Sequence, residues 1–245
     1  MRSVPLSRAA ASGMDITSAE PGGTTMSDGR LVIGTKRYSS WSMRGWLAVA
    51  CAGLDVTEVL IPLAGGDTSA VKEATPSGLV PYLEHDGARV WESLAIIEYC
   101  AEQEPKLWPK GRRARAMARA IAAEMHASFR DLRQAMPMNL GRDDYVGLGQ
   151  TEGALADIAR IEAIWEEAWH EFGEDGPFLF GKRFTGADIM FAPIVARLLT
   201  YAPPLSEGSR AYCAAVRAYP HVDTWYRDAA VEPAEWRLEK YESLR

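Results

Sequence analysis

The 245-residue sequence contains few residues of the kinds that form disulfides or bind metals. Its three cysteines, Cys51, Cys100 and Cys213, are far apart, and none forms a C-x-x-C redox motif. Each lies in an apolar, helix-like context, which predicts buried, reduced thiols in a cytoplasmic protein. The four histidines are scattered, and no pair of them has metal-ligand spacing. The sequence therefore argues against a metal site.

Long apolar runs and an excess of positive charge are also absent. No apolar run approaches the length of a membrane span. The formal net charge is −6, whereas a protein that binds nucleic acid needs a basic face. We therefore expect neither a membrane nor a nucleic acid as a partner.

Residues 1–29 differ in composition from the rest of the chain. They are rich in Ser, Thr, Gly, Ala and Pro and show no sustained periodicity. This composition predicts a disordered tail or an extension from a start codon assigned too early. Met26 is then the favoured true start and Met14 the alternative. Two arginines before the first acidic residue also fit an organelle transit peptide.

Strand and helix patterns alternate over residues 30–105, which predicts an α/β unit with a mixed sheet. The last two strands are separated by His85-Asp86-Gly87, a hairpin signal. A linker with two prolines follows at 104–113. The expected strands are Leu31–Ile33, Val56–Ile61, Pro81–Glu84 and Ala88–Trp91. The expected helices are Trp41–Ala52 and Ser93–Gln103, with a weak helix or a loop at Ser69–Ala74.

Residues 114–245 lack strand signals and predict an all-helical domain. Apolar residues at helical spacing predict one long helix that ends at Pro137. Its apolar stripe comprises Met117, Ile121, Met125, Phe129, Leu132 and Met136. Further helices are expected at Ile158–Phe172, Asp188–Thr200, Ser209–Ala218 and His221–Ala230. The helix Asp188–Thr200 is apolar nearly all round, so we expect it to be buried, and Thr185 has capping-box spacing to Asp188.

The stretch LVIGTKRYSSWSMRGW, residues 31–46, reads as a strand, a polar turn and the start of an amphipathic helix. Ser39, Ser40 and Ser42 place hydroxyls where that helix begins. One of them could simply cap the helix. Alternatively, a hydroxyl at this position could donate a hydrogen bond to an anion that the helix N-terminus also attracts.

The serine stretch resembles a motif of the cytosolic glutathione S-transferase family. SSWSMR, residues 39–44, is similar to the serine motif of zeta-type enzymes, which carry a cysteine at the position of Trp41. The segment EMHASFRDLRQAMPMNL, residues 124–140, is more loosely similar to bacterial relatives. Three further matches are the family's cis-proline loop at Val80-Pro81, its glutathione-binding turn at Glu92-Ser93 with LAIIEY, and its capping box at Phe184-Thr185-x-x-Asp188.

This resemblance implies a thioredoxin-like α/β domain at 30–105, an all-α domain at 114–245, and a homodimer. It implies glutathione as co-substrate, activated as a thiolate to attack a small electrophile in detoxification. Alternatives are glutathione-dependent cis–trans isomerisation of the zeta type and a non-catalytic binding protein of the same fold. No metal is implied.

The glutathione contacts follow from the matched motifs. Ser93, at a helix N-terminus, suits the γ-glutamyl carboxylate, and Glu92 suits the neighbouring ammonium group. Val80, held extended by Pro81, would present its backbone to the cysteinyl residue. Lys72 is a candidate for the glycine carboxylate.

The thiol of glutathione then lies at the start of the first helix. A free thiol has a pKa of about 8.5, and a hydroxyl donor with a helix N-terminus behind it lowers that pKa. The resemblance assigns this donor role to Ser39, with Ser40 as the alternative and Tyr38 as a weaker one.

The co-substrate is expected between the two domains, against the long helix. The candidate wall residues are Trp41, Met125, Phe129 and Met136, although methionines at helical spacing are more often core. Arg130 and Arg133 could attract an anionic electrophile or could be solvent-exposed charges. His126 is expected at the surface or at the boundary between surface and core.

Overall fold

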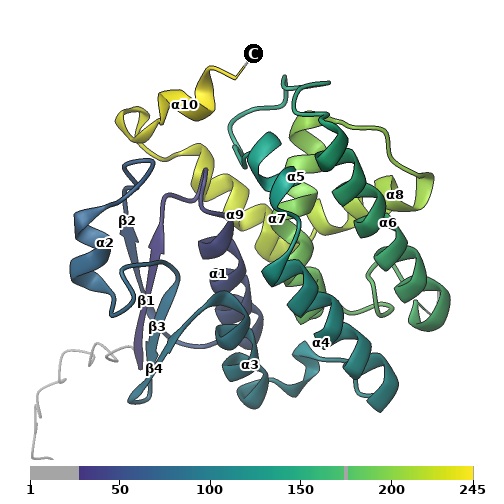
Figure 1. The fold of residues 1–245 in the computed structure, drawn as a ribbon. Coiled ribbons are helices and arrows are strands. Elements are labelled where there is room, and N and C mark those ends of the chain that lie inside the picture. The colour runs from purple at the N-terminus through teal and green to yellow at the C-terminus, as the bar shows by residue number, and fades with distance from the viewer. Residues whose placement is uncertain (1–27, 174–175, 245) are drawn as a thin grey trace, which may run out of the picture.

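The computed structural model describes residues 28–173 and 176–244 (Figure 1). The expectation of a tail or an extension over residues 1–29 falls mainly on residues 1–27, which lie outside this part of the chain, whereas Gly29 belongs to the first strand. Within it, no helix is long and apolar enough to cross a membrane.

The first domain is built on a four-stranded mixed sheet in the order β2-β1-β3-β4. The central strand β1 is parallel to β2 and antiparallel to β3, which in turn is antiparallel to β4. This arrangement confirms the mixed sheet predicted from the sequence. The strands are β1 (Gly29–Gly34), β2 (Thr57–Ile61), β3 (Tyr82–His85) and β4 (Ala88–Trp91).

The turn between β3 and β4 has the geometry that its sequence predicts. Asp86 and Gly87 have φ angles of 49° and 76°. A two-residue hairpin loop with two positive φ angles matches the right-handed twist of the flanking strands. The hairpin then leads directly through β4 into the turn at Glu92.

Helices cover both faces of this sheet, as Figure 1 shows. Leu31 and Ile33 of β1 belong to the same buried cluster as Met43 of α1, whereas Val32 packs in a second cluster with Val71 of α2. This alternation follows from the period of two along a strand. The helices of the domain are α1 (Ser40–Ala52), α2 (Ser69–Ala74) and α3 (Ser93–Gln103).

The second domain is all-helical and packs on the α1 and α3 side of the sheet (Figure 1). Its core helix α7 is buried along nearly its whole length, as the sequence predicts; Leu199 is the exposed exception, at 42 %. The elements are η1 (Pro105–Leu107), α4 (Arg112–Ala127), α5 (Arg130–Ala135), α6 (Glu152–Phe172), α7 (Gly186–Tyr201), α8 (Glu207–Arg217), α9 (Pro220–Ala230), η2 (Ala234–Trp236) and α10 (Glu239–Glu242).

The expected single long helix is instead two helices, α4 and α5. The chain breaks at Phe129, whose φ angle is 63°. After the break, the backbone N–H of Leu132 donates to the Asp157 carboxylate of α6 over 3.0 Å. The prediction of one helix was wrong because the spacing of apolar residues continues across the break. Such spacing does not indicate that a single residue adopts a left-handed backbone conformation.

The predicted capping box at the start of α7 is confirmed. The backbone N–H and the hydroxyl of Thr185 each donate to Asp188 Oδ2 over 2.8 Å. The other oxygen, Oδ1, accepts from the Leu179 N–H at 3.1 Å and the Tyr212 hydroxyl at 3.0 Å. Four donors thus hold a carboxylate that is fully buried.

Candidate active site

The N-terminus of α1 is held to the end of β1 by a chain of hydroxyls. Ser39 is the N-cap of α1, and its Oγ accepts from the Ser42 N–H at 3.3 Å. Ser39 Oγ lies 2.7 Å from Ser42 Oγ, which accepts from the Gly34 N–H at 2.9 Å. The Ser39 hydroxyl is the donor of its bond to Ser42 Oγ. Because a hydroxyl can both donate and accept, this bond can reverse when a ligand accepts from Ser39.

Ser39 and Ser40 line the same cavity between the two domains, of about 340 Å³. Ser40 Oγ accepts from Arg197 Nη2 of α7 at 3.4 Å. The structure thus brings both candidate serines to one site, and both remain candidates for the thiol contact.

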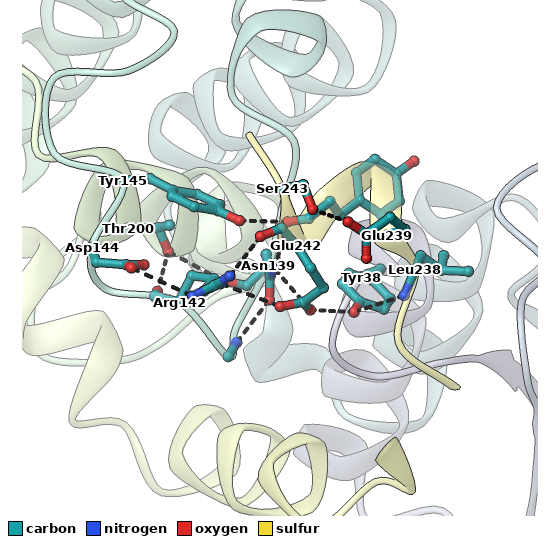
Figure 2. Close-up of polar contacts among 12 residues, drawn as sticks. Tyr38, Asn139, Arg142, Asp144, Tyr145, Thr200, Leu238, Glu239, Glu242 and Ser243 are labelled. Atoms are coloured by element: carbon teal, nitrogen blue, oxygen red, sulfur yellow. Dashed lines mark hydrogen bonds and ion pairs between the residues drawn. The ribbon is translucent and has the colours of Figure 1, made fainter. Parts of the chain in front are cut away.

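The Tyr38 hydroxyl binds the C-terminal segment of the chain. Its hydroxyl donates to Glu242 Oε1 at 2.5 Å and accepts from the Leu238 N–H at 3.2 Å, as Figure 2 shows. Burial, together with the bond to Glu242, raises the pKa of Tyr38 to about 12. A hydroxyl that already donates to a carboxylate is a poor candidate for the thiol contact.

The C-terminal segment, residues 234–244, forms one wall of this cavity through Tyr241. Asn139 Nδ2 and the Tyr145 hydroxyl each donate to the Tyr241 carbonyl over 2.8 Å. Arg142 Nη2 donates to the Glu242 carbonyl over 2.5 Å (Figure 2). The sequence analysis missed this wall because no local pattern in the segment indicates where it packs.

A second cavity, of about 230 Å³, lies at the cis-proline loop. The Val80–Pro81 peptide is cis, as the resemblance implies. A Cβ added at Gly45 of α1 would lie within 2.8 Å of the Pro81 ring, so a glycine is required for this close approach. Val80, Pro81, Glu92 and Ser93 all line this cavity, which agrees with their predicted proximity.

Ser93 is the clearest candidate for a ligand contact in this cavity. Its side chain is fully buried, and its Oγ has no hydrogen-bond partner among the described residues. It begins α3, whose N-cap Glu92 makes no side-chain cap and has a φ angle of 68°. An unpaired hydroxyl beside an uncapped helix N-terminus, after a strained residue, suits a bound carboxylate.

Trp41 connects the two cavities, because it lines both of them together with Leu79 and Val80. The guanidinium carbons of Arg44 and Arg133 each lie 4.8 Å from the centre of its indole ring. His126 makes an edge contact to the same ring, with the centroids 5.2 Å apart. Trp41 is therefore in the position expected for a co-substrate wall.

The other expected wall residues are not in either cavity. Met125, Phe129 and Met136 are buried in the main hydrophobic core, where their stripe packs against other helices. Pro137 and Met138, which directly follow Met136, line the cavity instead. The helical spacing of these residues correctly predicted that they are buried, but it did not distinguish burial in the core from a place in a cavity wall.

Lys72 lies near the interdomain cavity but not in its lining. Its ammonium pairs with Asp67 at 2.7 Å, and its side chain is 55 % exposed. Asp67 itself lines the cavity. Of the two arginines considered from the sequence, Arg130 is exposed and Arg133 lines the cavity.

Arg197 is a site residue that the sequence analysis missed, although a signal was present. It is a charged residue within a helix that the sequence predicts to be buried on every side. A buried charge in such a helix needs a partner or a function.

Comparison with known proteins agrees with this geometry. Residues 38–103 match the model of the glutathione S-transferase N-terminal domain, and residues 119–228 match that of the C-terminal domain. A maleylacetoacetate isomerase of Rattus norvegicus is 28 % identical over 188 residues, 74 % of this chain and 84 % of that protein. Glutathione S-transferase L3 of Arabidopsis thaliana is 26 % identical over 191 residues, 76 % and 73 % of the two chains.

Solved structures show the same fold. A glutathione transferase homologue from Burkholderia, crystallised with bound glutathione, superposes with a TM-score of 0.62 at 22 % identity, covering 84 % of this chain and 99 % of that one. The two domain models together span most of the described chain, and the sheet, the cis-proline loop and the capped core helix are those that the resemblance implies. The chain therefore belongs to the glutathione S-transferase family.

Proposed function

We propose that this protein is a glutathione transferase that binds glutathione across the two cavities and activates its thiol for attack on a small electrophile. The observation that carries the proposal is the buried, unpaired hydroxyl of Ser93 at the uncapped start of α3. The serine turn at Ser39 lies across Trp41 from it, in the adjoining cavity.

The γ-glutamyl group is the part of glutathione that fits the Ser93 cavity. Its carboxylate would accept from the Ser93 hydroxyl and the N–H groups at the start of α3, and its ammonium would pair with Glu92. Glu92 lies 3.5 Å from His126 Nε2. Burial lowers the pKa of His126, so its imidazole is neutral at pH 7 and leaves the Glu92 charge available to the ammonium.

The cysteinyl and glycyl parts would extend from this cavity into the larger one. Val80, before the cis proline, would offer its backbone to the cysteinyl residue, and Lys72 stays the candidate for the glycine carboxylate. The thiol then reaches the start of α1, where a serine hydroxyl donates to the sulfur and the helix N-terminus favours its negative charge. The thiol proton leaves to solvent, and the thiolate attacks the electrophile and displaces its leaving group.

An isomerase function is the second candidate, favoured by the similarity to a maleylacetoacetate isomerase. The thiolate would add to a conjugated carbon–carbon double bond, the resulting single bond would rotate, and the thiolate would then be expelled. Glutathione would not be consumed. A purely non-catalytic role is less well supported, because it would require neither the unpaired Ser93 nor the serine turn.

The direct test compares serine variants by the ultraviolet absorbance of bound glutathione thiolate as a function of pH. We expect Ser39→Ala to raise the pKa of the bound thiol by at least one unit, or about 1.4 kcal/mol, with Ser40→Ala as the matched control. We expect Ser93→Ala to weaken glutathione binding about tenfold, as loss of one charge-assisted hydrogen bond implies.

Two results would change this proposal. If Ser40→Ala shifts the thiol pKa and Ser39→Ala does not, Ser40 is the thiol donor. If the protein does not bind glutathione, the proposed function is wrong. Consumption of glutathione with a panel of electrophiles and isomerisable substrates would separate transferase from isomerase chemistry.

We also propose a cytoplasmic homodimer with a role in detoxification, as is typical of the family. The three cysteines are free, which agrees with a reducing compartment. Sedimentation equilibrium of the full chain would test the dimer.

A further inference from the structure

Three arginines from different helices meet beside the interdomain cavity. Arg44 comes from α1, Arg133 from α5 and Arg197 from α7. Arg44 and Arg197 are only 1 % and 5 % exposed. Arg133 and Arg197 line the cavity, and Arg44 lies behind Trp41. We call these three residues the arginine cluster.

The arginine cluster has little internal compensation for its charge. Nη1 of Arg44, Nε of Arg133 and Nε of Arg197 are buried and have no hydrogen-bond partner within the described part of the chain. The ion pairs among residues 28–173 and 176–244 include none of the three guanidinium groups. The bonds they do make are to neutral oxygens, such as Arg44 Nε to the Met190 carbonyl and Arg197 Nη1 to the Pro193 carbonyl, both at 2.9 Å.

The electrostatic consequence is visible in the pKa values of the cluster. Burial, and then the charges of Arg133 and Arg197, hold the pKa of Arg44 well below its usual range. Burial and the charge of Arg133 lower the pKa of Arg197 to about 10. Asp157 acts in the opposite direction, but on Arg133 alone. Positive charge is therefore concentrated at one side of the cavity without an acidic partner in contact.

We propose that Arg133 and Arg197 bind a carboxylate of the electrophilic co-substrate, so that this enzyme prefers electrophiles that carry an anionic group. This inference rests on the proposed function. Guanidinium groups match a carboxylate in geometry, and charge-assisted bonds to it would pair nitrogens that are now unpaired. Arg44 adds its charge from behind Trp41 and need not touch the ligand.

The location assigns the carboxylate to the co-substrate and not to glutathione. The γ-glutamyl carboxylate is accounted for at Ser93, in the cavity on the other side of Trp41. Arg197 donates to Ser40, which is adjacent to Ser39, the proposed thiol donor. A carboxylate held there places the reacting carbon within a few bonds of the anionic group.

A pair of glutathione conjugates tests the proposal by binding alone. S-(3-carboxypropyl)glutathione carries an additional carboxylate on its S-substituent, and S-(3-carbamoylpropyl)glutathione carries a neutral amide of the same size and shape in its place. Titration calorimetry of the full-length protein should show the carboxylate conjugate binding at least tenfold more tightly. This preference should fall to about threefold or less in Arg133→Met and in Arg197→Met.

Arg130→Met is the matched control, because Arg130 is an exposed arginine on the same helix and its loss changes the net charge equally. We expect this variant to keep the wild-type preference. Arg133 is only partly buried, so Arg133→Met gives the answer even if Arg197→Met does not fold.

Three outcomes would overturn the inference. The first is equal affinity of the two conjugates for the wild-type protein, while glutathione itself binds. The second is a preference that survives in both variants. The third is a raised pKa of the bound glutathione thiol in both variants with the preference unchanged, which would assign the arginine cluster to the thiolate. Failure to bind glutathione or either conjugate would instead reject the proposed function, and this inference with it.

Discussion

The two ends of helix α7 each carry a buried charged residue, and the two residues differ in how far their hydrogen-bonding groups are paired. Asp188, at the N-terminus, accepts four hydrogen bonds from three residues packed around it. Arg197, near the C-terminus, is also buried, but its Nε is unpaired within the described chain and its other contacts are to neutral oxygens. A charge that the fold itself satisfies serves stability, whereas one left unsatisfied in a cavity is available to a ligand.

The pKa shifts of Asp188 and Arg197 show the same difference between the two residues. Burial raises the pKa of Asp188, and each of its four hydrogen bonds opposes that rise. For Arg197, burial and the neighbouring Arg133 act in the same direction and lower the pKa. The fold therefore offsets part of the cost of burying the charge at one end of α7 and adds to that cost at the other.

The largest expected effect is the loss of stability when the Asp188 carboxylate is removed. Asp188→Ala would leave buried donors of Thr185, Leu179 and Tyr212 unpaired, and we expect the free energy of unfolding to fall by about 3–5 kcal/mol. Urea denaturation followed by circular dichroism would measure it. A loss below about 1 kcal/mol would show that the network is not important for stability.

A much smaller effect on stability is expected when Arg197 is replaced. Arg197→Met removes a buried, unpaired charge, so the free energy of unfolding of the unliganded protein should change by less than about 1 kcal/mol or increase. The same denaturation measurement applies. A loss comparable to that of Asp188→Ala would remove the contrast and make Arg197 a structural residue.

The smallest effect is a titration shift at His126, which reports the field of the arginine cluster. Burial lowers its pKa most, Glu92 raises it, and Arg44 and Arg133 lower it further. Arg133→Met should therefore raise the pKa of His126 by a fraction of a unit in an NMR titration, whereas Asp188→Asn should leave it unchanged. An unchanged pKa in Arg133→Met would mean that the cluster does not act on this side chain.

The sign of the associated stability effect follows from linkage. The pKa of His126 is below its usual value of about 6.5, so the unfolded chain binds its proton more readily. The contribution of His126 to stability is thus fully present above about pH 6.5 and is lost as the pH falls through the folded-state pKa.

Local sequence patterns predicted those features that are determined locally. The hairpin at Asp86-Gly87 needs positive φ angles that these residues tolerate, and the capping box at Thr185 and Asp188 lies within a single turn. The resemblance indicated the turn at Glu92-Ser93 as a candidate glutathione contact, and the unpaired Ser93 hydroxyl is the observation that supports this proposal.

Features that depend on contacts between distant segments could not be predicted. Arg44 and Arg197 are 153 positions apart in sequence and meet only because α1 packs against α7. Conversely, Met125 and Met136 have the spacing of a buried face, but spacing does not distinguish a core from a binding cavity. The structure places them in the core.

The C-terminal segment has a practical consequence for work on this protein. Leu238 and Glu242 bind Tyr38, immediately before the serine turn (Figure 2). Tyr241 lines the cavity. An affinity tag or reporter fused shortly after Leu244 would thus be tethered near this cavity. Expression vectors and immobilisation chemistry for assays are best designed to leave this terminus unmodified.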